Sequence, residues 1–385
     1  LVSEKKLFKG LIFKTNLHSF FKKKICYFVE YNFSMNKEIS SGTYSVLFKQ
    51  KGFDYLSNHL NNINYSKIFV HVDNNTKKNC LDLFLNKINL EKYELIESKD
   101  GEENKNIYSC LKLWEIISDK NGDRNSLIIN LGGGVVSDMG GFIASTYKRG
   151  INYINIPTTL LSMVDASIGG KTGIDFGILK NQIGTFYDPQ MVIIEPDFLK
   201  TLQKEQISSG YAEILKHSLI YDLKTFNLLI KNGKTTHDIN TIYDSVCTKN
   251  SIVLIDKKEK KERKSLNYGH TLGHAIESYF LNTEKKLLHG EAIAIGIVLA
   301  SFISNKLFDF SFDYVISIKK HIDLIYSKIE INESEIESII GLLIHDKKNS
   351  HGKINFVLLE DIAKPIYDVQ VKTNLIKESF KYYLS

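Results

Sequence analysis

The segment Ser126–Thr146 constrains the fold of this 385-residue chain more than any other. Ser126-Leu-Ile-Ile-Asn130 is a short apolar run typical of a buried strand, and the small residues of Met139–Thr146 predict a helix. Between them lies Leu131-Gly-Gly-Gly-Val-Val-Ser-Asp138. In a strand–glycine turn–helix unit, backbone N–H groups and the helix N-terminus can approach a pyrophosphate. The segment therefore predicts an α/β domain that binds a nucleotide.

The glycine turn is nevertheless not the usual nucleotide fingerprint. Gly132-Gly-Gly134 departs from the G-x-G-x-x-G pattern, and no acidic residue follows at a persuasive distance for a ribose contact. A tight turn that needs three permissive residues would also explain these glycines. A nucleotide bound at Gly133, Gly134 and Val135 is the interpretation we favour.

Four further runs predict strands of the same sheet. Lys67–Asp73 is rich in β-branched and aromatic residues and is followed by two Asn residues, which indicates a buried strand that runs into a turn. The others are Lys92–Glu97, Ile151–Ile156, which Pro157 ends, and Met191–Glu195. Open α/β sheets bind ligands at strand ends of this kind.

Beyond Asp197 the pattern changes from strand to helix. Apolar residues recur three and four positions apart in Gln206–Tyr221, Lys224–Lys231, Asp238–Glu259 and Ile293–Phe308. A chain of 385 residues also exceeds one ordinary core. We therefore expect an α/β domain over residues 35–197 and a mostly α-helical domain over residues 198–385.

Two histidines suggest a metal site. His270 and His274 are four residues apart within Asn267–Glu277, so on a helix both imidazoles project from one face. Glu213 and His289 offer further ligands, and one carboxylate with two imidazoles leaves an open position, as in catalytic zinc sites. A lone His pair at helical spacing is more often an ordinary surface or core feature.

Positive charge gathers beside a pair of glycines. Arg149, Lys171 and Lys180 lie in one stretch of the chain, close to Gly169-Gly170 and Asp165. Surface lysines are usually solvated. However, three cationic side chains close to glycines are typical of a pocket that binds phosphate and carboxylate groups.

Composition narrows the class of protein. Hydrophobic residues make up 43% and charged residues 24%, which is ordinary globular composition. The net charge of +6 suits an anionic small substrate, and no nucleic-acid motif accompanies it. The four cysteines form no C-x-x-C pair, so we expect a reducing, cytoplasmic setting. No apolar run reaches the roughly 18 residues that cross a bilayer, so we expect no membrane partner.

The first 34 residues differ from the rest. They are rich in Lys and Phe, they contain no acidic residue between Glu4 and Glu30, and the first Met of the chain is Met35. A translated upstream stretch, a targeting extension and a basic arm are the three interpretations, and a secretory signal is excluded because its apolar centre is missing. We favour a basic N-terminal extension outside the fold.

Taken together, the motifs closely resemble those of the 3-dehydroquinate synthase family, the sugar-phosphate cyclases of the shikimate pathway. The resemblance runs in order and with nearly unchanged spacing from about Tyr44 to the C-terminus. Its motifs are Gly132-Gly-Gly-Val-Val-Ser-Asp138, Pro157-Thr-Thr-Leu-Leu-Ser-Met-Val-Asp-Ala-Ser-Ile-Gly-Gly-Lys171, Lys180-Asn181, Gly210-Tyr-Ala-Glu213, Asn267-Tyr-Gly-His270 and His289-Gly-Glu291.

The resemblance implies an α/β NAD-binding domain, an α-helical metal-binding domain and an active site in the cleft between them. It implies a carbon–oxygen lyase that converts 3-deoxy-D-arabino-heptulosonate 7-phosphate to 3-dehydroquinate and phosphate, for aromatic amino acid and chorismate biosynthesis. The substrate is oxidised transiently with NAD, loses phosphate, is reduced again, and closes by ring opening and an intramolecular aldol step. Zn²⁺, or Co²⁺, is the expected metal.

The resemblance also assigns roles to individual residues. Its metal ligands are Glu213, His270 and His289. Its partners for the substrate phosphate and hydroxyls are Lys171, Asn181, Asn267, His274, Arg149 and Lys347, the last favoured over Lys348. Its carboxylate clamp is Lys249 with Arg263, and Asp165, Lys216 and Glu259 bind hydroxyls and organise the metal site. Its NAD contacts are Asp73, Glu102, Lys105, Asp138, Thr158 and Thr159, to which we add Lys171 and Lys180. In this family the arginine matching Arg149 comes from the neighbouring subunit, so a homodimer is expected.

Three alternatives stay open. A sister cyclase acting on glucose 6-phosphate or sedoheptulose 7-phosphate would share the fold and the metal ligands. A metal-dependent polyol dehydrogenase would accumulate NADH and would have little need for Lys171, Lys249 and Arg263 together. A non-catalytic binding protein on this scaffold would have lost a ligand, whereas every expected residue is present.

Overall fold

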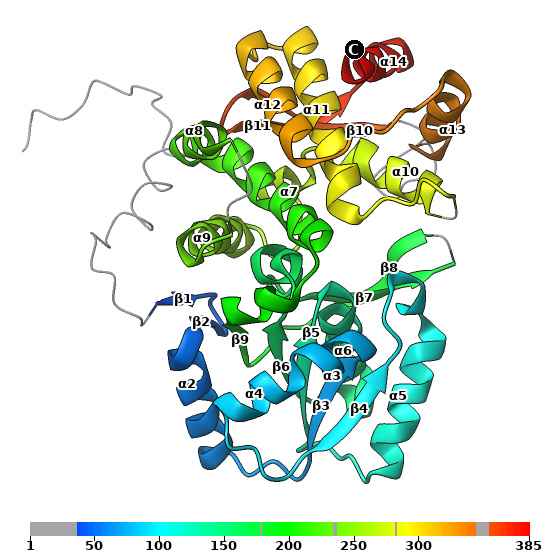
Figure 1. The fold of residues 1–385 in the computed structure, drawn as a ribbon. Helices are drawn as coiled ribbons and strands as arrows, with labels where there is room; N and C mark the ends of the chain where they lie inside the picture. Colours follow the sequence, from blue (N-terminus) through cyan, green and yellow to red (C-terminus); the bar gives the residue numbers. More distant parts are fainter. Residues whose placement is uncertain (1–36, 178, 234–236, 282, 344–353) are drawn as a thin grey trace, which may run out of the picture. The chain divides into compact units, whose positions relative to one another are not determined.

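The computed structural model describes residues 37–177, 179–233, 237–281, 283–343 and 354–385. The chain divides into two units between Ser34 and Met35, and every described residue belongs to the second. In this part of the chain seven strands form one sheet, in the order β1-β2-β9-β6-β5-β3-β4 (Figure 1). The strands are β1 (Glu38–Ser40), β2 (Ser45–Phe48), β3 (Ile68–Asp73), β4 (Glu94–Ser98), β5 (Leu127–Gly132), β6 (Asn152–Pro157) and β9 (Met191–Ile194). Every neighbouring pair except β1 and β2 is parallel, which confirms the predicted α/β class.

Helices cover both faces of the sheet because successive strand residues point to opposite sides. On β3, Phe69 packs into the cluster that contains Leu113 of α5, whereas Val70 packs into the cluster that contains Phe53 of α2 and Phe84 of α4. The helices are α2 (Lys49–Asn62), α3 (Asn74–Asn79), α4 (Leu81–Lys87), α5 (Ile107–Asp119) and α6 (Gly134–Thr146). Burial on both faces explains the near-continuous apolar runs of these strands.

The strand order fixes where a ligand can bind. The chain passes from β3 outward to β4 and then returns to β5 on the other side of β3. The carboxyl ends of β3 and β5 therefore flank a point where the connections leave in opposite directions, which is where open α/β sheets bind ligands. Asp73 ends β3, and Gly132 ends β5 directly before α6.

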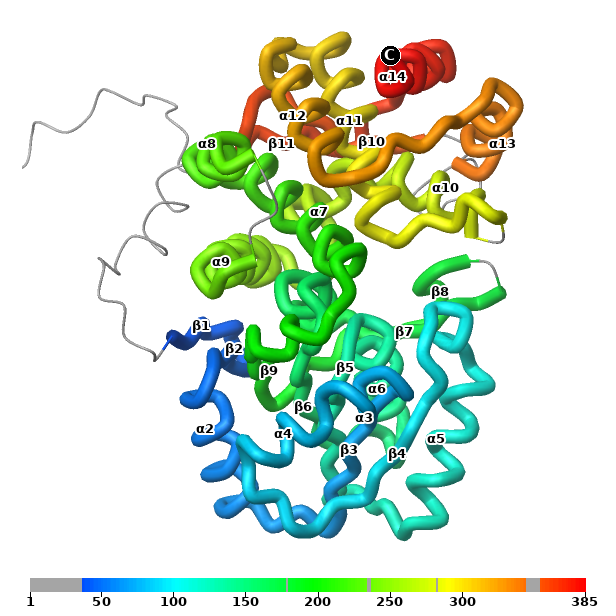
Figure 2. Tube along the Cα trace, viewed as in Figure 1, coloured from blue at the N-terminus to red at the C-terminus, as the bar shows by residue number. Residues whose placement is uncertain are grey.

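A two-stranded hairpin, β7 (Lys171–Phe176) and β8 (Leu179–Phe186), lies along α6. Thr172 and Ile174 are buried, and the Thr185 hydroxyl donates to Oγ of Ser145 in α6 at 2.8 Å. These two strands were not predicted, because the glycines of this segment hide the alternation of buried and exposed residues. The β8 end of the hairpin lies near α10 (Figure 2), where Lys180 of β8 pairs with Glu277.

After β9 the chain is mostly helical, as predicted. The elements are η4 (Pro196–Thr201), α7 (Lys204–Tyr221), α8 (Leu223–Asn232), α9 (Ile239–Ile255), η5 (Glu262–Asn267), α10 (His270–Phe280), α11 (His289–Leu307), α12 (Phe312–Ile325), α13 (Glu333–Leu343), the hairpin β10 (Asn355–Asp361) and β11 (Lys364–Gln370), and α14 (Thr373–Leu384). α9 ends at Ile255, not at the predicted Glu259. The cause is Asp256, whose carboxylate accepts hydrogen bonds from the N–H groups of Lys260 and Lys261 and so closes a turn.

The helix α11 lies at the centre of this helical part. It contacts α7, α10, α12 and α14, and Gly290 lets its first turn approach the backbone of Ser209 in α7. Among the described residues, α11 is the one helix long and apolar enough to cross a membrane by length and composition. In that respect the expectation of no such run was wrong, although 78% of its apolar window is buried inside the protein. α11 is therefore explained as a core helix.

Candidate active site

Three helices bring one carboxylate and two imidazoles together. Glu213 of α7 is fully buried, and its Oε1 lies 3.4 Å from Nε2 of His270 in α10 and 3.5 Å from Nε2 of His289 in α11. These three residues come from segments that are separated in the sequence. Their convergence is the geometry that a shared ion requires.

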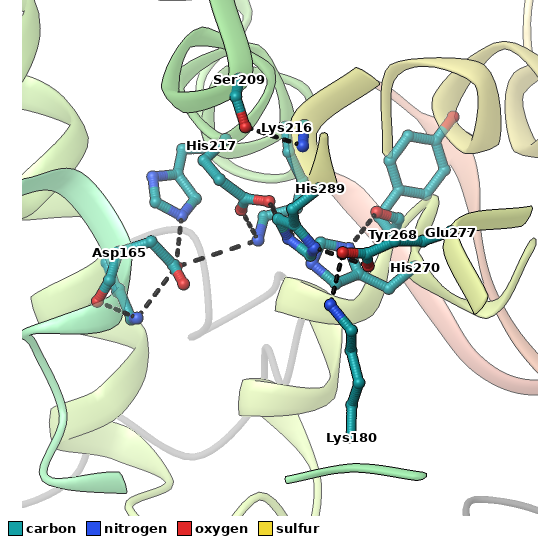
Figure 3. A network of polar contacts seen from close by, with 12 residues as sticks. Asp165, Lys180, Ser209, Lys216, His217, Tyr268, His270, Glu277 and His289 are labelled. Carbon is teal, nitrogen blue, oxygen red and sulfur yellow. Dashed lines mark hydrogen bonds and ion pairs between the residues drawn. The ribbon is translucent and has the colours of Figure 1, made fainter. Parts of the chain in front are cut away.

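A hydrogen-bond acceptor at Nδ1 of each histidine orients the ring so that Nε2 faces Glu213. Nδ1 of His270 lies 3.2 Å from the carbonyl oxygen of Tyr268, and Nδ1 of His289 lies 3.1 Å from Oε2 of Glu277 (Figure 3). A carbonyl or carboxylate oxygen accepts hydrogen bonds, so each Nδ1 carries the proton. With a metal ion bound, each Nε2 would direct its lone pair at that ion, the arrangement by which metal-binding histidines are oriented.

The donor atoms fit a divalent transition metal. Oε1 of Glu213 is buried and has no hydrogen-bond partner in the described part of the chain. Ligands at about 2.0–2.1 Å from a tetrahedral ion lie roughly 3.4 Å apart, close to the two distances observed. Glu213, His270 and His289 therefore form a suitable three-ligand set with room for a fourth ligand.

Two other groupings compete for an ion. His274, one turn after His270, has its ring centroid 5.1 Å from that of His270 and 5.7 Å from that of His289, so three histidines from α10 and α11 also come together. Asp165, Glu213 and His217 form the second group. In the second group Asp165 is already paired with Lys249 at 2.9 Å, whereas Oε1 of Glu213 faces His270 and His289. We therefore place the metal among the histidines and Glu213.

Asp165 is held by three groups at one oxygen. Its Oδ1 lies 2.9 Å from Nζ of Lys249, 3.5 Å from Nε2 of His217 and 4.0 Å from Nζ of Lys216. Burial alone would raise the pKa of Asp165, but the two ammonium groups hold that pKa well below its usual range. The carboxylate is therefore anionic and able to accept a hydrogen bond from a hydroxyl.

Lys249 and Arg263 place two buried cations near each other. Burial lowers the pKa of Lys249 to about 8, and the charge of Arg263 acts in the same direction while Asp165 opposes it. Arg263 donates through Nη1 to the carbonyls of Gly169 and Lys257, and its buried Nε has no partner among the described residues. Two like charges with unused donor capacity favour an anion between them.

The nucleotide edge of the sheet carries a second charged network. Lys105 is buried and donates to Asp138 at 2.6 Å and to Asn181 at 2.7 Å. Burial lowers the pKa of Lys105, but Asp138 and Glu102 outweigh it and raise that pKa above its ordinary value. Lys180 of β8 lies 3.5 Å from Glu102. These predicted NAD contacts therefore lie together at the carboxyl ends of the strands.

The other predicted NAD contacts lie at the same edge. Asp73 caps α3 by accepting from the N–H group of Thr76 at 2.7 Å, Thr158 is buried directly after β6, and Oγ1 of Thr159 lies 2.9 Å from Oγ of Ser162. The first turn of α6, with Gly133, Gly134 and Val135, has no side-chain cap. Its backbone N–H groups are therefore suited to an anion.

A third set links Lys171, Glu259 and Asn267. The Lys171 ammonium pairs with Oε2 of Glu259, and the Asn267 amide donates to Oε1 of Glu259 at 2.5 Å. Glu259 has φ 58° and Asn181 has φ 51°, a left-handed conformation that is costly for residues other than glycine. Strained residues of this kind cluster at functional sites.

Two predicted residues are not placed in this site. Arg149 is exposed and directly precedes β6, so it lies at the amino edge of the sheet, whereas the site lies at the carboxyl edge. Lys347 falls outside the described residues, as does Lys348.

Two neighbours of the site were missed by the sequence analysis. Glu277 holds His289 and also pairs with Lys180 at 2.5 Å (Figure 3). Its position seven residues after His270 on an expected helix, hence on the same face, was the available signal. The second, His217, follows Lys216 directly and gave no comparable signal.

Comparison with known proteins assigns the family. Residues 95–209 match the model of the 3-dehydroquinate synthase N-terminal domain, and residues 210–349 match that of the C-terminal domain. The 3-dehydroquinate synthase of Parabacteroides distasonis is 40% identical over 332 residues, which cover 85% of this chain and 94% of that protein.

Among solved structures, 2-deoxy-scyllo-inosose synthase with carbaglucose-6-phosphate, NAD⁺ and Co²⁺ superposes with a TM-score of 0.79 at 24% identity, over 90% of this chain and 99% of that one. The 2-epi-5-epi-valiolone synthase of Streptomyces hygroscopicus, with NAD⁺ and Zn²⁺, gives 0.78 at 24% identity, over 92% and 99%. With both halves of the fold matched in order, the chain belongs to the 3-dehydroquinate synthase family.

Proposed function

We propose that this protein converts 3-deoxy-D-arabino-heptulosonate 7-phosphate to 3-dehydroquinate and phosphate. The observation that carries the proposal is the contact of Lys180, at the nucleotide edge, with Glu277, which holds His289 of the metal set. A nucleotide at the first turn of α6 and a metal at Glu213 would therefore face one substrate. We also propose that the chain divides near Asp197 into the NAD-binding and metal-binding domains.

Glu213, His270 and His289 would hold Zn²⁺ or Co²⁺, and Gly133, Gly134 and Val135 would receive the phosphates of NAD. When bound, the metal polarises a substrate hydroxyl and NAD takes up a hydride and returns it. The relatives crystallised with NAD⁺ and either Co²⁺ or Zn²⁺ support this pairing of cofactors.

The charged side chains fit the two ends of the substrate. Lys249 and Arg263 form the carboxylate clamp, because an anion relieves the repulsion that helps to lower the pKa of Lys249. Asp165 accepts a hydrogen bond from a substrate hydroxyl. Lys171 and Asn267, joined through Glu259, bind the phosphate.

In this arrangement the substrate phosphate would lie beside Lys171 and Asn267, whose side chains are both held by the carboxylate of Glu259. Asn181 and Asn267 orient it, and Lys171 supplies charge. The phosphate oxygen of the substrate itself can take the proton that is lost during elimination, so no separate protein base is required. His274, on the same helix face as His270, contributes a further polar contact to this group.

A direct assay separates the proposal from its alternatives. Purified protein loaded with NAD and Zn²⁺ should consume the heptulosonate phosphate and release inorganic phosphate, with no net accumulation of NADH. A sister cyclase would instead consume glucose 6-phosphate or sedoheptulose 7-phosphate. A polyol dehydrogenase would accumulate NADH without releasing phosphate, and either result would overturn the proposal.

We further propose that the protein acts as a homodimer in which Arg149 of one copy serves the site of the other. Strand β8 offers the surface, because Leu179, Ile183 and Phe186 are 41%, 37% and 49% exposed. In the described residues β8 pairs only with β7, so its outer edge can accept another strand.

Antiparallel pairing of two β8 strands about a two-fold axis would bury these apolar side chains. The end of β8 at Phe186 leads into Tyr187, whose hydroxyl donates to the carbonyl of Ile151, close to Arg149. The pairing would therefore bring Arg149 of one copy near Asn181 of the other.

Mixing two inactive variants tests this arrangement. Arg149→Ala retains its own metal ligands, and His270→Ala retains its arginine. If Arg149 acts across the dimer, a heterodimer of the two has one complete site, and mixing should restore activity. No recovery from chains shown to exchange subunits would contradict the arrangement.

A further inference from the structure

His217 is a buried histidine of α7 that the proposed chemistry leaves without a role. Its side chain is 1% exposed, Nδ1 lies 2.7 Å from Oγ of Ser245 in α9, and Nε2 lies 3.5 Å from Oδ1 of Asp165 (Figure 3). Apart from this approach to Asp165, Nε2 has no polar partner in the described part of the chain. A buried ring nitrogen directed at a site carboxylate calls for an explanation.

The neighbours of the ring determine its tautomer. A proton on Nδ1 would leave the lone pair of Nε2 facing the anionic oxygen of Asp165. A proton on Nε2 faces that oxygen favourably, and the hydroxyl of Ser245 can then donate to Nδ1. Burial also lowers the pKa of His217, which keeps the ring neutral.

We propose that His217 is a positioning residue. As the Nε2–H tautomer favoured by the anionic oxygen of Asp165, with Ser245 donating to Nδ1, it holds the carboxylate of Asp165 in the orientation that accepts a substrate hydroxyl. The lysines cannot supply this restraint alone, since an ammonium group attracts the carboxylate without a fixed direction, whereas the buried ring, held at Nδ1 by Ser245, presents one N–H vector. The substrate part of this inference rests on the proposed function, and the tautomer does not.

Nitrogen NMR tests the tautomer on the intact protein. With ¹⁵N-labelled histidine rings, Nε2 of His217 should show the shift of a protonated nitrogen and Nδ1 that of an unprotonated one. Signals lost in His217→Asn supply the assignment. Ser245→Ala removes the donor to Nδ1 but leaves Asp165 in place, so the proton should stay on Nε2 in that variant. A proton on Nδ1 in the wild-type protein would overturn the inference.

Two amide substitutions separate positioning from packing. The amide nitrogen of His217→Gln can reach the position of Nε2 and donate to Asp165, whereas that of His217→Asn falls short. His217→Asn should raise KM for the heptulosonate phosphate by about tenfold to a hundredfold, as expected for the loss of a hydrogen bond to a charged group. The KM of His217→Gln should stay within about threefold of the wild-type value, because the hydrogen bond to Asp165 is kept.

His321 supplies a matched control. It is also buried, on α12, with Nε2 2.8 Å from the Tyr211 hydroxyl and Nδ1 without a partner among the described residues. His321→Asn should lower thermal stability about as much as His217→Asn while KM stays unchanged.

Equal losses of activity in both His217 variants, in proportion to lost stability, would show that the ring only fills space and would overturn the inference. If the wild-type protein fails to turn over the heptulosonate phosphate while Nε2 of His217 carries the proton, the proposed function fails instead.

Discussion

Oε2 of Glu277 lies 3.1 Å from Nδ1 of His289, so one carboxylate selects the ring nitrogen that His289 presents to Glu213. The same carboxylate contacts Lys180 through Oε1 at 2.5 Å. Burial would raise the pKa of Glu277, but His289 and Lys180 hold that pKa far below its ordinary value. Glu277 is therefore a fixed acceptor and not a proton donor.

Glu277→Ala should weaken Zn²⁺ binding by about 10- to 100-fold, the range for loss of a residue that orients a metal-binding histidine. Competition with a chromophoric chelator measures the change. Lys180→Met keeps the Glu277–His289 contact and should alter metal affinity much less. Equal losses in both variants would mean that overall charge, and not ring orientation, sets the affinity.

Metal content should distinguish the two neighbouring histidines of α10. His270→Ala should lose bound metal and turnover while NAD binding is largely kept, because His270 lies 3.4 Å from Glu213. His274→Ala should keep the metal and lose turnover. Metal analysis by mass spectrometry after dialysis decides, and retention of metal together with turnover in His270→Ala would show that the ligand assignment is wrong.

Substrate binding should weaken on the alkaline side because of Lys249. Its pKa of about 8 lies below the ordinary 10.5, and the charged groups around it are Asp165, Arg263 and Lys216. Below pH 8 the ammonium attracts the substrate carboxylate; above pH 8 the free protein progressively loses that charge, so kcat/KM should fall by up to about tenfold per pH unit. In Lys249→Met, kcat/KM should be lower than in the wild-type protein at neutral pH, and it should no longer fall as the pH rises. A wild-type profile that is flat between pH 7 and pH 10 would contradict the clamp.

Lys171→Met should weaken binding of a phosphonate mimic of the substrate by about 2 kcal/mol, the size of a lost charge-assisted contact. Lys257 is a close control, since its side chain is 48% exposed and pairs with Asp188, compared with 47% for Lys171 paired with Glu259. Lys257→Met should leave the affinity unchanged by isothermal titration. Equal affinities for the two variants would place Lys171 outside the pocket.

Two glycine substitutions should change stability in opposite directions. Gly290→Ala would drive a Cβ into the backbone of Ser209 and separate α11 from α7, costing about 1–3 kcal/mol of unfolding free energy and some metal affinity. Gly341 of α13 is exposed, with nothing near an added Cβ, so Gly341→Ala should add up to about 1 kcal/mol. Urea unfolding monitored by circular dichroism gives both values.

The elements with strong periodicity were predictable. β3, β5 and β6 appear as continuous β-rich runs because both faces of the sheet are covered, and α7 and α11 show helical spacing. The face shared by His270 and His274 also follows from spacing alone. Glu213 and His289 were named from the sequence as further possible ligands, but the set Glu213, His270 and His289 came from the family resemblance, because no local pattern links segments so far apart.

Elements defined by distant partners were not predictable. The strands β7 and β8 owe their form to packing on α6, and their glycines conceal the alternation of buried residues. The end of α9 depends on one side chain, Asp256, that captures backbone N–H groups. The roles of Glu277 and His217 depend on which residues the tertiary fold places next to them. The spacing of residues in a single sequence does not reveal those contacts.

The contact between Lys180 and Glu277 has a consequence for dissecting the chain. A fragment containing only the helices would still carry Glu213, His270 and His289, but Lys216 and Lys249 would lose Asp165 and Glu277 would lose Lys180. Uncompensated buried charges cost several kcal/mol each. Separately expressed halves should therefore fold poorly and bind metal weakly. A split protein should recover metal binding only when its two pieces reassemble.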